Sequence, residues 1–162
     1  WFRWNDCAPR TERYTHEFKG FGKHRYHDTD FNWEQGRAVS ESDSGDESFP
    51  IPDQALDELS MLLRARCVFA TGDKEYSATS VYGDDIREHH FIVIDRETID
   101  TPMGDLDTLV VEKKREEDKE ESRRTLFWVA PEVGYMVVKA RHIESALLHG
   151  ELIMTEYNGP TP

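Results

Sequence analysis

The sequence predicts a mainly β protein: an antiparallel meander forming a strongly curved sheet or half-open barrel, with one α-helix packed on it. Three observations predict this class. Short segments of alternating bulky and polar residues recur along the chain, turn residues separate them, and a single segment carries apolar residues at helical spacing. Consecutive strands joined by short polar turns favour antiparallel neighbours. We expect one domain over 1–162, since this length supports a single core.

The first expected strands lie near the N-terminus. Bulky and polar residues alternate in the segments WFRW, RYTHEF and HRYHDTDFNW. The stretch that follows, SESDSGDES, is polar and acidic and contains a glycine. We therefore expect residues 40–48 to form an acidic flexible loop.

One helix is expected in the segment IPDQALDELSMLLRARCVFATG. Asp53 follows Pro52 in the manner of an N-cap, and Thr71 with Gly72 ends the segment. Apolar residues recur at helical spacing at Leu56, Leu59, Leu63 and Cys67. We expect this helix to pack on a sheet face, and a lid over a cavity is the alternative.

After the helix the pattern predicts only strands. The segments KEYSATSVY and IREHHFIVID are separated by a turn at Gly83, and DTPMGD forms the next turn. Two further segments, LDTLVVEKK and RRTLFWVA, flank a charged run over 112–121, which we expect to be a solvated hairpin tip. The strands MVVKARHIE and LLHGELIMTEY follow, and the tail 158–162 is expected to fray.

The strand in RTLFWV is apolar on both faces. Leu126 and Trp128 share one face because side chains alternate along a strand, and Phe127 and Val129 share the other. We expect this strand to be covered on both sides. Pro131 ends it, since proline cannot continue a ladder of backbone hydrogen bonds.

The charge of the chain excludes some partners. The formal net charge is −13 and the isoelectric point is about 4.9, so nucleic acid and anionic membrane surfaces are not expected partners. The apolar runs are short and separated by charges, so we expect no membrane-spanning helix. The first residue is Trp1 rather than Met, which favours a trimmed chain or a processed, exported protein.

The two cysteines leave two alternatives. Cys7 and Cys67 are sixty residues apart and neither lies in a CxxC motif, which argues against a metal role. In an oxidising compartment they could pair, but the sequence provides no geometry that predicts it. The favoured interpretation is that Cys67 is a small buried apolar residue on the helix.

No motif predicts a metal, a cofactor or a catalytic residue. Asp28, Asp30 and Asn32 occupy the first offsets of a calcium loop, but Trp33 and Val39 stand where that loop needs glycine and glutamate. We expect the three polar residues to share a solvent-facing side of a strand. Histidine spacing supports no zinc site, and no nucleotide-binding or hydrolase motif is present.

Several short motifs resemble one family. The segment from Glu97 to Glu144 contains a turn, a strand, a charged hairpin and an Arg-Thr-x-x-Trp-x-Ala-Pro motif in the order typical of it. The residues that match are Glu97, Thr101, Pro102, Gly104, Arg124, Thr125, Trp128, Ala130, Pro131, Tyr135 and Val137. Through these residues, the chain resembles the domain of unknown function 3108 family of exported proteobacterial proteins.

Further positions agree with that family and two depart from it. Asp57, Leu59 and Ser60 fill the helix motif, whereas Met136 and Lys139 replace more usual residues. The family usually has additional N-terminal strands and a signal peptide. The resemblance implies a β-rich domain in the Gram-negative periplasm or envelope. More distantly, it implies a fold similar to lipoprotein carriers, which at the level of fold says little about function.

Three functions are consistent with the sequence. The favoured one is a non-enzymatic periplasmic binding module for an apolar ligand such as a lipid or acyl chain. Its expected lining residues are Leu63, Phe127, Trp128 and Val138. The second is an envelope protein that binds other proteins or has a structural role, and the third is a hydrolase with an unrecognised site. We expect no cofactor and favour a protein that is not an enzyme.

Overall fold

The computed structural model describes residues 1–5, 7–20, 22–114, 123–145 and 147–159. In chain order its elements are β1 (Phe2–Asn5), β2 (Ala8–Thr11), β3 (Arg13–Gly20), β4 (Lys23–Asn32), β5 (Arg37–Ser42), β6 (Gly45–Pro50), α1 (Glu58–Ala70), β7 (Glu75–Tyr82), β8 (Asp85–Thr101), β9 (Gly104–Lys114), β10 (Arg124–Ala130), the 3-10 helix η1 (Pro131–Val133), β11 (Met136–Ser145) and β12 (Leu148–Ile153).

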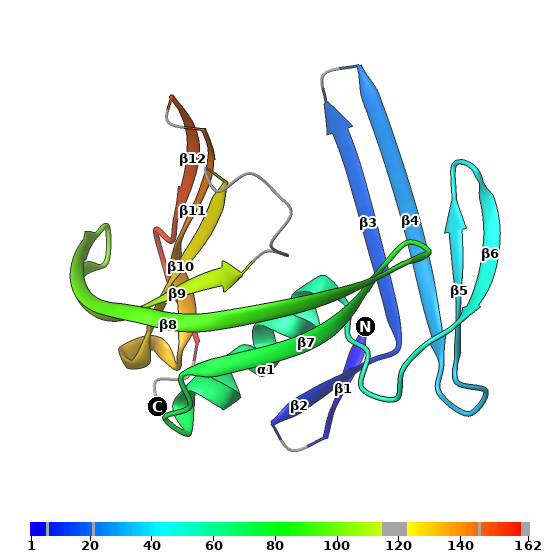
Figure 1. Ribbon diagram of the computed structural model, residues 1–162, viewed down its shortest axis with the longest axis horizontal. Helices are drawn as coiled ribbons and strands as arrows, with labels where there is room; N and C mark the ends of the chain where they lie inside the picture. The colour runs from blue at the N-terminus through cyan, green and yellow to red at the C-terminus, as the bar shows by residue number, and fades with distance from the viewer. Residues whose placement is uncertain (6, 21, 115–122, 146, 160–162) are drawn as a thin grey trace. The chain divides into compact units, whose positions relative to one another are not determined.

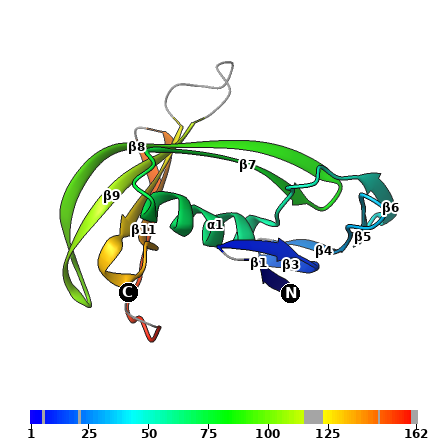
Figure 2. The same cartoon turned by 90° about the horizontal axis from the view of Figure 1, so that it is seen from below.

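These strands form three open sheets. β1 pairs with β2, β3 to β6 form a four-stranded meander, and a six-stranded sheet has the order β12-β11-β10-β9-β8-β7. The predicted fold class is confirmed: the described residues are mainly antiparallel β structure with one α-helix. Figure 2 shows β8 and β9 curling together toward the turn that joins them, which is the expected curvature. None of the described sheets closes on itself.

Contacts divide the chain into two compact units, each described by itself below. The first unit comprises Trp1–Arg64 and Ala78–Glu88, and the second comprises Ala65–Ser77 and His89–Pro162. The division passes through α1, β7 and β8. The expectation of one domain over 1–162 stays a prediction.

The meander of the first unit has a core face and a solvent face. Figure 1 shows the strands β3, β4, β5 and β6 of this unit. Burial alternates along β5, where Ala38 and Ser40 are buried and their neighbours in sequence are exposed. Ser40 is accommodated in the core because its hydroxyl accepts a 3.1 Å hydrogen bond from the Thr29 hydroxyl. The apolar core cluster of this unit consists of Phe31, Ala38, Ile51, Ala55 and Val81.

The expected loop over 40–48 is wrong, because these residues form a hairpin. Ser40 pairs with Glu47, and Ser42 pairs with Gly45 around a two-residue turn. The Ser42 hydroxyl donates to the Gly45 carbonyl at 3.0 Å and thereby closes the turn. A strand ladder is made by backbone groups, so a polar and acidic segment can join a sheet when its neighbouring strand is regular.

The helix α1 begins later than the sequence suggested. Asp57, not Asp53, caps it: one carboxylate oxygen of Asp57 accepts hydrogen bonds from the backbone N–H groups of Leu59 and Ser60, each at 2.9 Å. Residues 53–54 instead form a turn in which the Ala55 N–H donates to the Pro52 carbonyl. The expected end of the helix is confirmed, since α1 stops at Ala70 before Thr71 and Gly72.

The later start also changes which side chains are buried. Leu59 was expected in the apolar stripe but is 57% exposed, whereas Ser60 and Met61 are buried. Leu56 lies before the helix and forms a parallel bridge with Ser80. A helical pattern that starts at Leu56 therefore predicts the wrong buried face for the first turn of α1, because Leu56 is not in the helix.

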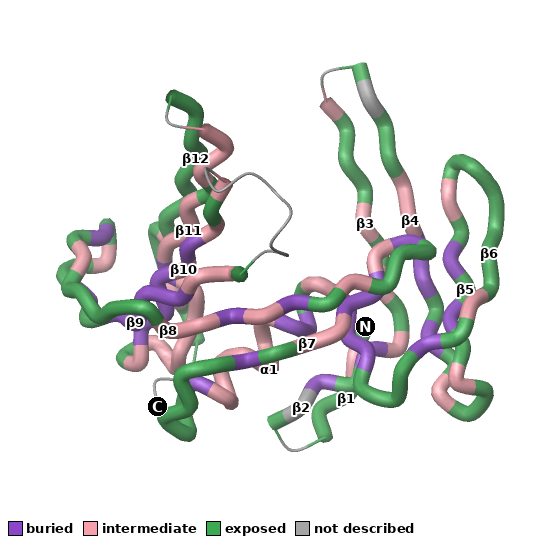
Figure 3. The backbone as a smooth tube through the Cα atoms, in the orientation of Figure 1, coloured by how far each residue is buried: buried purple, intermediate pink, exposed green. Residues whose placement is uncertain are grey.

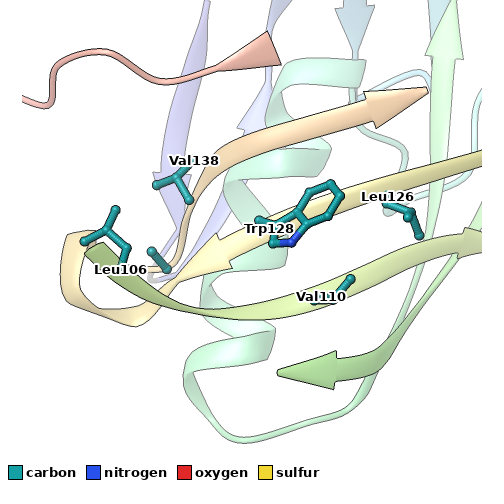
Figure 4. Close-up of a cluster of buried hydrophobic side chains, with 6 residues drawn as sticks. Leu106, Val110, Leu126, Trp128 and Val138 are labelled. Atoms are coloured by element: carbon teal, nitrogen blue, oxygen red, sulfur yellow. The ribbon is translucent and has the colours of Figure 1, made fainter. Parts of the chain in front are cut away.

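In the second unit β10 is buried on both faces, as expected. Leu126, Trp128 and Ala130 belong to a core cluster with Leu106, Val110 and Val138, which Figure 4 shows gathered around the Trp128 indole. On the opposite face, the Phe127 ring packs edge-on to Phe91 at a centroid distance of 6.1 Å. The strand ends at Ala130, before Pro131, as predicted.

The corner after β10 depends on left-handed backbone. Gly134 has a φ of 67° and Tyr135 a φ of 59°, and the Tyr135 N–H returns to the Ala130 carbonyl at 2.9 Å. The Arg66 guanidinium donates to the Gly134 carbonyl at 2.7 Å, so α1 holds this corner. The glycine permits the turn into β11 at Met136.

Two predicted features fall partly outside the described residues. The described part of the charged run, Glu112–Lys114, belongs to β9, and residues 115–122, where its hairpin tip was expected, lie outside the description. In the expected frayed tail, Asn158 and Gly159 belong to no strand or helix, and residues 160–162 lie outside the description.

Candidate ligand-binding face

The three predicted lining residues of the second unit lie on two opposite faces of its sheet. Trp128 and Val138 are 4% and 1% exposed and pack in the same cluster of the second unit. Phe127 is half-buried on the opposite face of β10. Leu63 is half-buried on the part of α1 that belongs to the first unit. A ligand-lining role for these residues stays a prediction. In the second unit, Phe127 belongs to a line of apolar side chains that ends at an exposed residue.

This line of apolar side chains crosses five strands. The register pairs Val93 with Val111, Val111 with Phe127, Phe127 with Ala140, and Ala140 with Leu152. Directly paired residues project from the same side of a sheet, so these five side chains form one line, which we call the apolar row. At a strand spacing of about 4.8 Å, the row is about 19 Å long.

The inner end of the apolar row is covered and its outer end is not. Rings of Phe69, Tyr76 and Phe91 form a chain of contacts that reaches Phe127, so aromatic side chains cover this side of the row. At the other end Leu152 is 77% exposed, and Figure 3 shows β12 exposed along its length. Leu148 lies two residues before Gly150, on the same face of β12, and is 62% exposed.

A polar row runs beside the apolar row on the same face. The register pairs Lys113 with Thr125, Thr125 with His142, and His142 with Gly150. Each of these residues lies two positions from a member of the apolar row, so the side chains point the same way. The Thr125 hydroxyl and the His142 Nδ1 are 2.9 Å apart. The face thus combines an apolar line with adjacent hydrogen-bonding and cationic groups.

The opposite face of the same strands is closed by charged groups. The Lys139 ammonium and the Arg141 guanidinium lie over the Trp128 ring, 4.8 and 5.6 Å from its centroid. Both cations pair with Glu151 of β12, at 2.7 and 3.0 Å. The hydrogen bonds from Lys139 and then Arg141 hold the pKa of Glu151 below its ordinary value. The Trp128 indole N–H donates to Glu97.

Sequence reasoning missed the outer part of the apolar row. Ala140 and Leu152 were not among the expected lining residues, although LLHGELI contains Leu148, Gly150 and Leu152 at a spacing of two. That spacing predicts a shared face. What it does not provide is the register that aligns Leu152 with Phe127, because the register depends on two β-bulges, one between Trp128 and Val129 and one between Ile143 and Ser145.

The calcium-like motif is part of an ion-pair network. Asp28 was expected on a solvent face but is 6% exposed, because the Arg13 guanidinium covers it with hydrogen bonds of 2.8 and 2.5 Å. Within the described ranges, no group of three His, Cys, Asp or Glu side chains is arranged to hold a metal ion. The described helix is too short and too polar to cross a membrane.

The cysteines are oxidised. Cys7 and Cys67 are both disulfide-bonded, and Cys67 is half-buried, so the favoured interpretation of Cys67 as a small buried apolar residue on the helix is wrong. Spacing alone could not predict this state, since a disulfide depends on the distance and direction of the two Cβ atoms.

Comparison with known proteins gives a family but no activity. The model of the family described as protein of unknown function DUF3108 matches residues 1–150. No curated protein and no solved structure matches the chain. The family match extends over most of the chain, and the chain belongs to that family.

Proposed function

We propose that this member of the DUF3108 family is a non-enzymatic binding module for an apolar ligand, such as a lipid or an acyl chain. One observation carries the proposal: the apolar row continues from buried Val111 and half-buried Phe127 to Ala140 and to Leu152, which is 77% exposed. An apolar surface that is continuous with a core and ends in solvent is typical of a binding site rather than of a scattered exposed leucine.

The chemistry of the face favours an amphipathic ligand. Covering a leucine side chain fully contributes about 2 kcal/mol, so Leu148 and Leu152 together provide a useful part of a binding energy. Thr125 and His142 lie one row away, where a carboxylate or phosphate head group would exchange with their mutual contact and with the contact between His142 and Glu144. The shape of an open face, rather than an enclosed cavity, suits an acyl chain that follows the apolar row and lies across the strands.

The test compares two faces of the same strand. Leu152→Ser removes the outer end of the apolar row, and Ile153→Ser makes the matched change on the opposite face of β12, where Ile153 is 43% exposed. Both variants and the unchanged protein are titrated with a fluorescent fatty acid. We expect L152S to weaken binding at least tenfold and I153S to leave it within about twofold, which corresponds to a loss of about 1.4 kcal/mol for the former.

Native mass spectrometry of protein isolated without detergent provides a second readout. A bound species that dissociates from the unchanged protein but is missing from L152S supports the proposal. The absence of both a bound species and fatty-acid binding in the unchanged protein, with correct folding verified by circular dichroism, would overturn it.

A second function, protein interaction in the cell envelope, is favoured by the position of β12. This strand ends the six-stranded sheet in the described part of the chain, and all six of its residues are exposed. Such an edge can accept an extended segment of another protein by strand addition. Site-specific photo-crosslinking from His149 in intact cells tests it: adducts with one defined envelope protein support the function, and adducts with none count against it.

We also propose that the protein works in an oxidising compartment, the periplasm. The disulfide-bonded state of Cys7 and Cys67 supports this location, because structural disulfides persist there and are rare in the cytosol. Osmotic-shock fractionation of cells that express the full gene tests it, and recovery of the protein with cytosolic markers would be the contrary result.

A further inference from the structure

The first unit contains an open pocket that the apolar row does not explain. It has a volume of about 780 Å³, within the range of sites for small molecules. Its aromatic wall comes from Phe31 at the end of β4 and Trp33 in the turn that follows. Its polar rim has two sides. One comes from β1, β2 and the residue that follows β2, and the other comes from the end of β4 and the turn that follows it.

The aromatic wall is held rigidly. The rings of Phe31 and Trp33 are stacked, with centroids 5.6 Å apart and an interplanar angle of 27°. The Trp33 indole N–H donates to the Thr11 carbonyl at 2.7 Å, and the Arg10 guanidinium lies 4.7 Å from the ring centroid. The indole therefore has a fixed orientation before any ligand binds, and Trp33 remains partly exposed.

The polar rim alternates in charge. Arg3 and Arg10 contribute donors, and Glu12, Asp30 and Glu34 contribute acceptors. Two cations against three carboxylates give no site for a simple anion, and the intervening guanidinium groups disfavour a simple cation. Arg3 forms an ion pair with Glu12, and the Asp30 Oδ1 atom lies 3.9 Å from the Arg13 Nε atom. The rim therefore offers both hydrogen-bond donors and acceptors.

Arg10 has an unusual position in this rim. It is directly opposite Arg3 in the β1–β2 ladder, and like charges that face each other across strands are destabilising. Among the residues that the structure describes, no carboxylate pairs with Arg10, and the Arg10 guanidinium lies over the Trp33 ring. Its N–H groups are thus available to a ligand that carries acceptor oxygens.

We propose that this pocket binds a saccharide. A sugar ring has an apolar C–H face that packs on an aromatic wall and hydroxyl groups that both donate and accept hydrogen bonds. Trp33 supplies the wall, Arg10 donates to sugar oxygens, and Asp30 accepts from hydroxyl groups. The open shape of the pocket suits a unit within a longer chain. The site is in the first unit and is independent of the proposed apolar ligand.

The experiment uses nuclear magnetic resonance of the full chain labelled with nitrogen-15. The probes are the trisaccharides of glucose with α-1,4 and β-1,4 linkages and of N-acetylglucosamine, each added to about 10 mM because single-site sugar ligands bind weakly. We expect at least one probe to shift the indole N–H resonance of Trp33. That resonance is identified by its loss in Trp33→Phe, which retains an aromatic wall.

Two variants separate binding from folding. Arg10→Gln removes a donor on an exposed side chain and is expected to weaken the effective probe at least fivefold with an unchanged melting temperature. Arg25→Gln is the matched control on an exposed position of β4 outside the pocket and is expected to change nothing. Three outcomes overturn the proposal: no shift with any probe, an equal shift in R10Q, or an equal shift produced by sodium benzoate, which would indicate an anion site.

Discussion

At the scale of single residues, Asp28 illustrates how a motif acquires its role from its partners. Its carboxylate accepts hydrogen bonds from Arg13, from the Tyr26 hydroxyl at 3.2 Å and from the Thr15 hydroxyl at 3.3 Å. The bonds from Arg13 are the main cause that holds the pKa of Asp28 below its ordinary value, against the effect of burial. The carboxylate therefore ties β3 to β4.

We predict that Asp28→Asn lowers the free energy of unfolding by about 2 kcal/mol at neutral pH, because a buried carboxylate that accepts several hydrogen bonds is replaced by a neutral amide. The matched control is Asp30→Asn. Asp30 is 66% exposed and 3.9 Å from the same guanidinium, so we expect a change within about 0.5 kcal/mol. Urea denaturation measures both, and equal effects of the two substitutions would contradict the prediction.

The same group predicts the direction of a pH dependence. The pKa of Asp28 is lower in the folded than in the unfolded chain, so its stabilisation is present above the ordinary aspartate value of about 3.9. It is lost as the pH falls through the folded pKa. The difference in free energy of unfolding between the unchanged protein and D28N is therefore expected to shrink as the pH falls. A difference that stays constant down to about pH 2 would exclude this linkage.

At the scale of elements, the start of α1 is fixed by a contact with a distant strand. The second carboxylate oxygen of Asp57 accepts from the Thr11 hydroxyl at 2.6 Å, and the Asp57 N–H donates back to that hydroxyl at 3.1 Å. Both residues are buried. The local sequence pattern predicted Asp53 as the cap, whereas β2 stabilises Asp57 in that role by supplying its partner.

We predict that Asp57→Ala lowers the free energy of unfolding by about 2 kcal/mol or more, because it removes the helix cap and leaves the Thr11 hydroxyl without its acceptor. Asp53→Ala changes an exposed residue in the preceding turn and is expected to cost less than about 0.5 kcal/mol. Thermal and chemical denaturation compare the two variants. A larger loss in D53A would mean that the cap lies where the sequence pattern placed it.

The edge strand β12 is attached by charge as well as by backbone pairing. Glu151 receives hydrogen bonds from Lys139 and Arg141 of β11, and these two cations lie over Trp128 of β10. Three strands are thus joined on the face opposite the apolar row. An attached β12 keeps Leu152 in register with Phe127.

We predict that Glu151→Gln loosens β12 without unfolding the protein. Backbone amides of 148–153 should exchange with deuterium faster, while those of β9 and β10 keep their rates. Because the pKa of Glu151 is lowered in the fold, the unchanged protein should lose the same protection as the pH falls through that pKa. Glu156→Gln is the control, since Glu156 is exposed, lies outside the strands and accepts a hydrogen bond from Asn158. Uniform acceleration across the sheet would contradict a local role.

At the scale of the whole molecule, the sequence predicted what depends on local pattern and missed what depends on partners. The strand at Thr125, its end at Pro131 and the corner at Gly134 follow from alternation and backbone chemistry, and the structure has them. The hairpin over 40–48 was missed because polar strands carry no apolar signal. The continuation of the candidate face to Leu152 was missed because the register across β10, β11 and β12 depends on bulges.

The oxidation state of the cysteines leads to a prediction for the whole chain. Cys7 and Cys67 are the only cysteines and both are disulfide-bonded. Protein isolated without reductant and then denatured should therefore react with no equivalent of a thiol reagent. Reduction should lower the free energy of unfolding by about 2–4 kcal/mol, because a disulfide restricts the unfolded chain. Cys7→Ser and Cys67→Ser should each reproduce that loss and become insensitive to reductant. A reactive thiol in the unreduced protein, or equal stability with and without reductant, would show that the folded chain does not depend on an oxidising compartment.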